Sequence, residues 1–578
     1  MRLLKLSFFA GALFLVPLLT FPSRSHSQQA PPAQAAPQPS EEGIPVTNQL
    51  VIDKCASCHK KDDKGRLTRI SWERTTPEGW QQVIKRMIRL NGLTLTPDEA
   101  RNIVRYLSNN HGLAPEEAKP ALYQAEHRIQ DETVPDESVR NACVICHTYG
   151  RIISQRRSKE EWDLLVNMHA GYFPVVEFQG FRRFPPPPDA PPPPPGTDTR
   201  HPADRAVDFL AKNFPLNTPE WATWRANLRT PKIAGRWLVT GYLIGQGRVF
   251  GEMTITPGAA EDEFITNTKL RFVKDGTTVT RTGRSIVYTG YSWRGRSTGN
   301  GNSATDPKEM REVMLLNRDS SQLEGRWFWG EYEEFGLDVT LRRVDTEMLV
   351  QGLDRFSIPK SSTNAQVKIY GGNLPADLKA ADIDFGPGIT VKRVVTVASD
   401  AATIEIDVAA DAAMGKRDLA VRRAFVPGAL TVYDKIDYIK VNPDNALARL
   451  GGVVYPKGYQ QFEAIGYNRG PDNKPQTADD LPLGPVPVEW SVEEFPAIYD
   501  DDDKDYSGTL SPTGLFTPAI EGPNPKRKHS RNNYGDLWIV ATYKPAMADK
   551  DAKPLTARSY LVVTVPLYVK WDQPEVAR

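Results

Sequence analysis

Two copies of one five-residue pattern contain every cysteine in this chain. They are Cys55-Ala-Ser-Cys58-His59 and Cys143-Val-Ile-Cys146-His147, in a sequence with 4 cysteines among 578 residues. This spacing places two thiols for thioether bonds to the vinyl groups of a haem, and the next histidine for one face of its iron. A zinc site or a redox disulfide does not need a histidine directly after the second cysteine. The pattern predicts two haem c groups, attached through the four cysteines, with His59 and His147 as axial ligands.

An internal repeat supplies a sixth iron ligand for each haem. Residues 76–80 and 158–162 both read as helix starts, one with a proline in its first turn and one with a Ser-x-x-Glu capping box. Each segment ends in a tryptophan, and superposing the two tryptophans puts Met87 over His169. Both lie seven residues further on, on the tryptophan's face of the helix. Because thioether and imidazole groups both bind haem iron, the repeat predicts His59/Met87 ligation for the first haem and His147/His169 for the second.

Other residues compete for these roles. Met168 is the alternative to His169, but it faces about 100° away on the helix. His111 and His127 are alternatives for either haem; His111 precedes a glycine at the end of a predicted helix and reads as a cap residue, and His127 lies in a charged stretch. Arginines near a haem edge pair with its propionates. The predicted propionate contacts are Arg66, Arg69, Arg151, Arg156 and Arg157.

The N-terminus has the pattern of an export signal. Arg2 and Lys5 precede an apolar run over residues 6–21, and small residues follow at 25–27. The run is short for a membrane span, and no later stretch is apolar enough to cross a bilayer. We expect a cleaved signal peptide and a periplasmic protein with no membrane span after signal removal.

The length of the chain and the change from helical to strand-like sequence patterns predict several domains. An N-terminal all-α diheme cytochrome c domain precedes three all-β domains, an antiparallel barrel and two sandwiches, of which the first is immunoglobulin-like. The expected boundaries are a signal peptide at 1–27, a flexible lead at 28–44, the diheme domain at 45–228 with a Pro-rich loop at 185–195, the barrel at 229–345, the immunoglobulin-like domain at 346–444 and the C-terminal sandwich at 445–578.

Charge argues against some functions. The 72 Lys and Arg residues nearly balance the 71 Asp and Glu residues, so nucleic-acid binding, which needs a basic surplus, is not expected. The acidic run 500–505 could bind calcium, but it lacks a full ligand spacing and reads as a solvated loop. Because both irons are predicted to be fully ligated, neither is expected to activate a small molecule.

The chain resembles the α subunit of quinohaemoprotein amine dehydrogenase. The resemblance covers nearly all of the sequence after the signal. In the N-terminal part it includes both Cys-x-x-Cys-His motifs, Thr76–Trp80, and the stretch from Tyr106-Leu to Glu117. In the β part it includes Gly235-Arg-Trp237, Ala448-Arg-Leu-Gly-Gly452 and Asn532-Asn-Tyr-Gly-Asp536. The Pro-rich stretch 185–195 is a departure from the family.

The resemblance implies an electron-transfer subunit. It implies a heterotrimer with a β-propeller subunit and a small subunit whose cysteine tryptophylquinone oxidises primary amines. Electrons would then pass through the haems of this chain to an external cytochrome c or copper protein. All four cysteines here are used by the haem motifs, so the quinone and the amine chemistry are expected on a partner. The alternatives are a stand-alone diheme redox or binding protein with β docking domains, and a diheme peroxidase-like enzyme.

Overall fold

The computed structural model describes residues 41–122, 133–182, 187–189, 191–301, 305–495, 501–545 and 553–566. The expected signal peptide, the lead up to residue 40, His127, Asp500 and part of the Pro-rich loop lie outside these residues. Within the described ranges, no helix is both long enough and apolar enough to cross a membrane.

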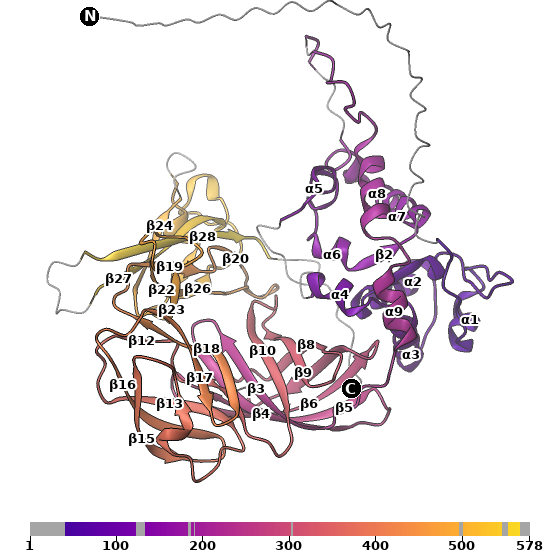
Figure 1. Cartoon of the computed structure of the whole chain (residues 1–578). Helices are drawn as coiled ribbons and strands as arrows, with labels where there is room; N and C mark the ends of the chain where they lie inside the picture. The colour runs from indigo at the N-terminus through magenta and orange to yellow at the C-terminus, as the bar shows by residue number, and fades with distance from the viewer. Residues whose placement is uncertain are drawn as a thin grey trace, which may run out of the picture. The chain divides into compact units, whose positions relative to one another are not determined.

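Helices dominate the N-terminal part of the chain (Figure 1). They are α1 (Gln49–Cys55), α2 (Pro77–Asn91), α3 (Pro97–Asn110), α4 (Pro115–Ala118), α5 (Glu137–Cys143), α6 (Gly150–Ile153), α7 (Lys159–Tyr172), α8 (Pro202–Asn213) and α9 (Pro219–Ala226), with short 3-10 turns η1 (Ile70–Trp72), η2 (Lys119–Ala121) and η3 (Pro174–Glu177). The haem motifs lie at the C-terminal ends of α1 and α5, so each first cysteine is the last residue of a helix.

The N-terminal part is not purely helical, contrary to the all-α prediction. Strand β1 (Glu73–Thr75) pairs antiparallel with β2 (Gln155–Arg157). The two strands occupy the same place in each half of the repeat, directly before α2 and before α7. Three-residue strands are too short to show a period-two pattern in a sequence, and only the pairing of the two halves creates them.

The predicted helix starts are present at both ends of the repeat. The Thr76 side chain caps α2 by accepting a hydrogen bond from the Gly79 backbone N–H, with Pro77 in the first turn. Ser158 caps α7 in the same way by accepting from the N–H of Glu161. These caps satisfy amide groups that a helix start otherwise leaves without partners.

The next part of the chain closes into an eight-stranded antiparallel barrel, as the sequence predicts. Its strands are β3 (Gly235–Leu243), β4 (Gly247–Pro257), β5 (Glu263–Phe272), β6 (Thr278–Tyr288), β7 (Ser292–Thr298), β8 (Glu309–Leu316), β9 (Gln322–Trp329) and β10 (Phe335–Val344), with β10 returning to pair with β3. Alternate residues point inward, and Trp237, Trp293 and Trp327 fill the interior with at most 1% of each exposed. Barrels of eight strands are just wide enough to be filled by side chains in this way.

Two four-stranded sheets follow the barrel and share one apolar core. One sheet runs β11 (Leu349–Leu353), β13 (Ala365–Gly372), β16 (Ala401–Val408), β15 (Ile389–Val397); the other runs β12 (Ser357–Pro359), β18 (Ala424–Tyr433), β17 (Gly415–Val421), β14 (Ile383–Asp384) beside the turn η4 (Ala380–Asp382). Val367, Phe385 and Leu430 belong to their common core. The arrangement is a sandwich, whose two inner faces bury alternate side chains.

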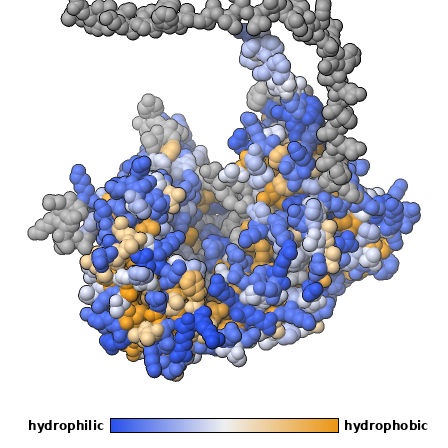
Figure 2. Space-filling view, in the orientation of Figure 1, coloured by the Kyte–Doolittle hydropathy of each residue, from blue (hydrophilic) through white to orange (hydrophobic). Residues whose placement is uncertain are grey.

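The C-terminal part contains one four-stranded sheet and two three-stranded sheets around a further core. Their strands are β19 (Tyr438–Asn442), β22 (Glu463–Asn468) and β23 (Leu481–Pro485); β20 (Asn445–Arg449), β28 (Leu555–Thr564), β27 (Gly535–Tyr543) and β24 (Glu489–Glu494); and β21 (Gln460–Gln461), β26 (Leu515–Pro518) and β25 (Gly508–Leu510), with the helix α10 (Asp503–Tyr506) and the turn η5 (Lys528–Ser530). Hydrophilic residues cover most of the face of the described chain in Figure 2.

Arg527 is a buried cation that holds the acidic run of the C-terminal part. Its side chain is 0% exposed, lies 2.8 Å from Asp502 and pairs with Asp503, and it donates to two backbone carbonyl groups as well. Arg531 adds contacts to Asp501 and Asp502. Oxygen atoms of Glu494, Asp501 and Asp503 lie within 4.8 Å of one another. Two arginines therefore pair with three aspartates, and the acidic run is part of an ion-pair network and not the solvated loop that the sequence predicts.

We predict that Arg527→Leu lowers the free energy of unfolding by about 3–5 kcal/mol, because it leaves buried carboxylates without their cation. Urea unfolding followed by tryptophan fluorescence measures this change. The matched control is Arg558→Leu, which removes an exposed pair with Glu493 and is expected to cost less than about 1 kcal/mol. Equal effects of the two substitutions would contradict the assignment.

Candidate functional site: two haem-binding lobes

In the first Cys-x-x-Cys-His motif, a hydrogen bond to the backbone fixes the ring of His59. The Nδ1 atom of His59 lies 2.8 Å from the backbone carbonyl oxygen of Thr68, to which it donates. That bond fixes the ring orientation and leaves Nε2 as the free donor atom, which is how metal-binding histidines are held. Cys55 closes α1 and is buried, whereas Cys58 is exposed.

The ring of His147, in the second motif, lies near the ring of His169 on α7. The ring centres of His147 and His169 are 6.4 Å apart, with the ring planes inclined by 48°. Nδ1 of His147 lies 3.1 Å from the Thr148 carbonyl oxygen, and Nδ1 of His169 lies 2.8 Å from the Leu165 carbonyl oxygen. Metal–imidazole bonds are about 2 Å long, so two imidazoles on one metal have ring centres about 6 Å apart. The observed separation of 6.4 Å between the ring centres is close to that distance.

Two residues that no sequence pattern indicated, Phe173 and Gln179, lie near His169 and Cys146. The Phe173 ring lies 6.2 Å from the ring of His169. The amide oxygen of Gln179 lies 4.0 Å from Sγ of Cys146. Both follow α7, in a segment with no regular period, so the sequence held no signal for their placement.

Met87 lies on α2, half-buried, at the position that matches His169 on α7. We call residues 41–113 the first lobe and the described residues of 133–214 the second lobe. Trp80 and Ile84 lie on the same face of α2 and are buried in the core of the first lobe together with Cys55 and Leu67. Met87 lies three residues after Ile84, on the same side of α2 as these two buried residues.

The two lobes repeat each other in their hydrogen bonds as well as in their helices. The indole N–H of Trp80 donates to the carbonyl oxygen of His111 at 3.0 Å, and that of Trp162 donates to the carbonyl oxygen of Phe214 at 3.2 Å. His111 and Phe214 are the C-cap residues of α3 and α8. His111 is thus a cap residue, as the sequence predicts. Burial, followed by the charge of Arg225, lowers the pKa of its imidazole to about 3, so the ring is neutral.

Four of the five arginines predicted near the haems, all except Arg151, have carboxylate partners in the described part of the chain. Arg66 pairs with Asp62 at 2.7 Å, and Arg69 pairs with Glu161 at 2.7 Å. Arg157 pairs with Glu73 and lies 3.9 Å from Glu161. The pairs of Arg69 with Glu161 and of Arg157 with Glu73 join the lobes, because Arg69 and Glu73 belong to the first lobe and Arg157 and Glu161 to the second.

Glu117 links the corresponding arginines of the two lobes. Its carboxylate accepts from Arg74 at 2.7 Å and lies 3.3 Å from Nε of Arg156, and all three residues are buried. Arg74 and Arg156 face each other in the β1–β2 pair. Burial by itself raises the pKa of Glu117, but the hydrogen bonds and charge of Arg74 and the charge of Arg156 outweigh it and lower the pKa to about 2.

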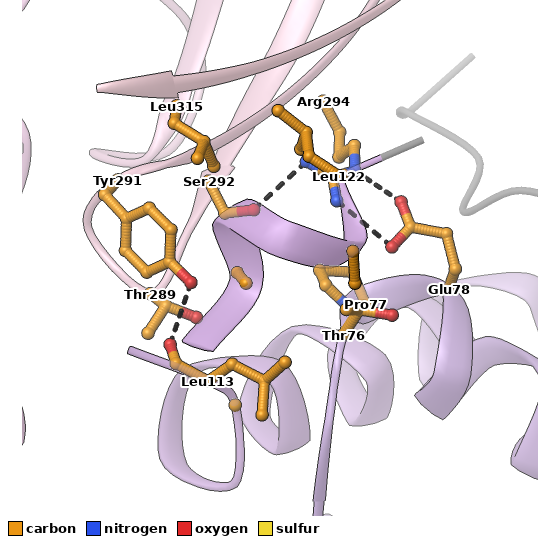
Figure 3. A pocket seen from close by; sticks show the side chains of 13 residues that line it. Thr76, Pro77, Glu78, Leu113, Leu122, Thr289, Tyr291, Ser292, Arg294 and Leu315 are labelled. Carbon is orange, nitrogen blue, oxygen red and sulfur yellow. Dashed lines mark hydrogen bonds and ion pairs between the residues drawn. The ribbon is translucent and has the colours of Figure 1, made fainter. Parts of the chain in front are cut away.

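A second joint fixes the first lobe to the barrel (Figure 3). Arg294 of β7 pairs with Glu78 of α2, and the Tyr291 hydroxyl donates to the Leu113 carbonyl oxygen at 2.9 Å. These groups line a cavity of about 20 Å³, which has room for a water molecule but not for an organic substrate. The cavity belongs to the joint, and its lining includes none of the cysteines and histidines of the two motifs.

The fold and the two motif sites define a haem-binding protein that carries a β-barrel and further β domains. Four family models match along the chain: "Quinohemoprotein amine dehydrogenase A, alpha subunit, haem binding" over 46–184, and the alpha subunit domains II, III and IV of quinohemoprotein amine dehydrogenase over 230–344, 358–434 and 439–576. The chain therefore belongs to the quinohemoprotein amine dehydrogenase α-subunit family.

Similarity to other known proteins is slight. No protein in the curated collection matches the chain. Among solved structures, a redesigned β-barrel, mFAP1, bound to DFHBI is 16% identical with a TM-score of 0.17 and covers 19% of this chain and 94% of that chain. Human mucin-like protocadherin EC1-2 is 12% identical with a TM-score of 0.15 and covers 38% and 98%.

We predict that acid weakens the joint between the lobes through Glu117. Its pKa is about 2 in the fold against an ordinary 4.5, so its contribution to stability is complete above about pH 4.5 and disappears as the pH falls toward 2. Glu117→Gln should remove that pH dependence and lower the stability at pH 7 by about 3 kcal/mol. Urea unfolding followed by haem absorbance measures both effects. The exposed neighbour Glu116, which pairs with Arg318, gives the control Glu116→Gln, and a matching loss in that variant would refute the prediction.

Proposed function

We propose that this chain is the electron-transfer subunit of a periplasmic quinohaemoprotein amine dehydrogenase. It would hold two haem c groups and pass electrons from a cysteine tryptophylquinone on a small partner subunit to an external cytochrome c or copper protein. A β-propeller subunit would complete the heterotrimer. The observation that carries the proposal is the pair His147 and His169, placed 6.4 Å apart beside a Cys-x-x-Cys-His motif in a chain of this family.

Each residue of the two sites has a stated role. The four cysteines would form the thioether bonds, His59 and Met87 would bind the first iron, and His147 and His169 the second. A bound haem would accept and donate one electron at its iron. This chain would hold the axial ligand on each side of the haem. The backbone carbonyl oxygens of Thr68, Thr148 and Leu165 contact Nδ1 of His59, His147 and His169, and such contacts fix the orientation of metal-binding imidazoles. All five arginines remain predicted propionate contacts, and Arg69, Arg156 and Arg157 also hold the lobes together.

Unlike ligands give the two haems different tasks. A thioether ligand raises the reduction potential of a haem relative to an imidazole ligand. The first lobe would therefore hold the haem of higher potential and receive electrons from the second. Two fully ligated irons have no open position for a peroxide, which argues for a relay over a peroxidase.

The decisive experiment for this function is purification of the native complex. Quinone staining should mark a small partner chain, and a primary amine should reduce the haems of this chain within the complex. Recovery of this chain without partners, with haems that no amine reduces, would refute the proposal and favour a stand-alone diheme protein.

The ligand assignment predicts a specific spectral loss. Met87→Ala should remove the weak sulfur-to-iron absorption band at the red end of the ferric spectrum and lower one of the two reduction potentials. Met168→Ala is the matched control, because Met168 lies on another face of α7, and its spectrum should equal that of the wild type. An unchanged spectrum in Met87→Ala would contradict the assignment of Met87 as an iron ligand and leave it as a packing residue.

A further inference from the structure

The two lobes differ in the connection that follows each proposed sixth ligand. In the first lobe, α2 ends four residues after Met87, and residues 92–96 lead directly into α3. In the second lobe, α7 ends three residues after His169, and residues 173–201 separate it from α8. Since α3 and α8 occupy the same place in the repeat, the second lobe contains an insertion that the shared fold does not require.

The first part of this insertion, residues 173–181, runs from the end of α7 back to the second haem motif. We call it the bridging segment. At its start, the ring of Phe173 lies 6.2 Å from the ring of His169. Near its end, the amide oxygen of Gln179 lies 4.0 Å from Sγ of Cys146. The bridging segment therefore lies beside both a proposed iron ligand and a proposed thioether cysteine.

Buried side chains and a close backbone approach hold the bridging segment in this place. Val176 and Phe181 belong to the core of the second lobe, with at most 9% of each exposed. A Cβ atom at Gly180 would lie 2.3 Å from the carbonyl oxygen of Ala142 on α5, so a larger residue would push the segment away from that helix. The position of the bridging segment is therefore fixed at α5 as well as at α7.

The bridging segment also carries large apolar side chains that the described part of the chain leaves uncovered. Phe173 is 60% exposed, Val175 50% and Phe178 74%. Exposed apolar groups gathered at one place mark a site where another group binds. The proposed haem would be bonded to Cys146 and to His169 at once, so it would lie within reach of the side chains next to these two residues. Phe173 is a large apolar side chain in that position.

We infer that the bridging segment is a wall of the second haem site, with Phe173 packed against the haem. This inference rests on the proposed second haem and adds the residues that shield it. An apolar wall keeps water away from the iron, and water favours the ferric form because it stabilises the additional positive charge. Phe173 therefore raises the reduction potential of the second haem. The matching position in the first lobe, eleven residues after the buried tryptophan, is the exposed and polar Asn91.

The test is a redox titration of the purified full-length protein with its haems. Electron paramagnetic resonance follows the two ferric haems separately, because their proposed ligands differ. Phe173→Ala should lower the potential of the haem with two imidazole ligands and leave the potential of the other haem unchanged. Phe173→Leu keeps an apolar side chain at this place, so its potential should return most of the way to the wild-type value. Because Phe173 is mostly exposed, neither substitution should prevent folding.

The control is Phe425→Ala, which removes a phenylalanine of similar exposure, 57%, from β18 outside both lobes. Neither potential should change in this variant. An unchanged potential of the haem with two imidazole ligands in Phe173→Ala, or an equal shift in Phe425→Ala, would overturn the inference.

Haem content and amine-dependent haem reduction are recorded in the same samples. Two haems per chain, with the expected shift in Phe173→Ala but no reduction by amines, would refute the proposed function and leave the wall in place. One haem per chain would refute the second haem site and the inference with it.

Discussion

The buried carboxylate of Glu117 is the interaction on which the arrangement of the two haem lobes depends. It meets Arg74 from the strand before α2 and Arg156 from the strand before α7. Two guanidinium groups buried side by side would repel each other. The carboxylate of Glu117 attracts both, so the two strands that carry them are held together. The pairs Arg157–Glu73 and Arg69–Glu161 extend the network on the other side of the two-stranded sheet. The distance between the proposed haems is thereby set by ion pairs and a short sheet.

The barrel extends this rigid arrangement into the β domains. Arg294 reaches Glu78 in the first turn of α2, and Tyr291 and Thr289 bond the backbone at the end of α3 and just beyond it. Because Met87 lies further along α2, the barrel fixes the helix that supplies the proposed sixth ligand. The tryptophan-filled interior gives the barrel a structural role, and a family whose members work as one subunit of a complex has use for such rigid scaffold domains.

The difference between the lobes is then a difference of one connection on a shared fold. The first lobe joins α2 to α3 through residues 92–96. The second lobe places the bridging segment, residues 173–181, beside His169 and Cys146. A repeat that keeps its caps, its tryptophan bonds and its paired arginines while lengthening one connection can give each haem different surroundings without changing how the haem is held.

The sequence alone indicated a haem-binding chain, because that signal resides in local patterns. The Cys-x-x-Cys-His spacing, the helix caps at Thr76 and Ser158, and the seven-residue step from Trp162 to His169 all act within a few turns of chain. The alternation of strands likewise indicated the barrel. The tertiary structure decided what no local pattern encodes: that β1 and β2 pair, that Glu117 meets arginines 43 and 39 positions away, and that Arg294 reaches Glu78 across 216 residues. Ion pairs over such separations depend on how whole elements pack. The sequence around Glu78, which directly follows Pro77, gives no sign that its partner is Arg294.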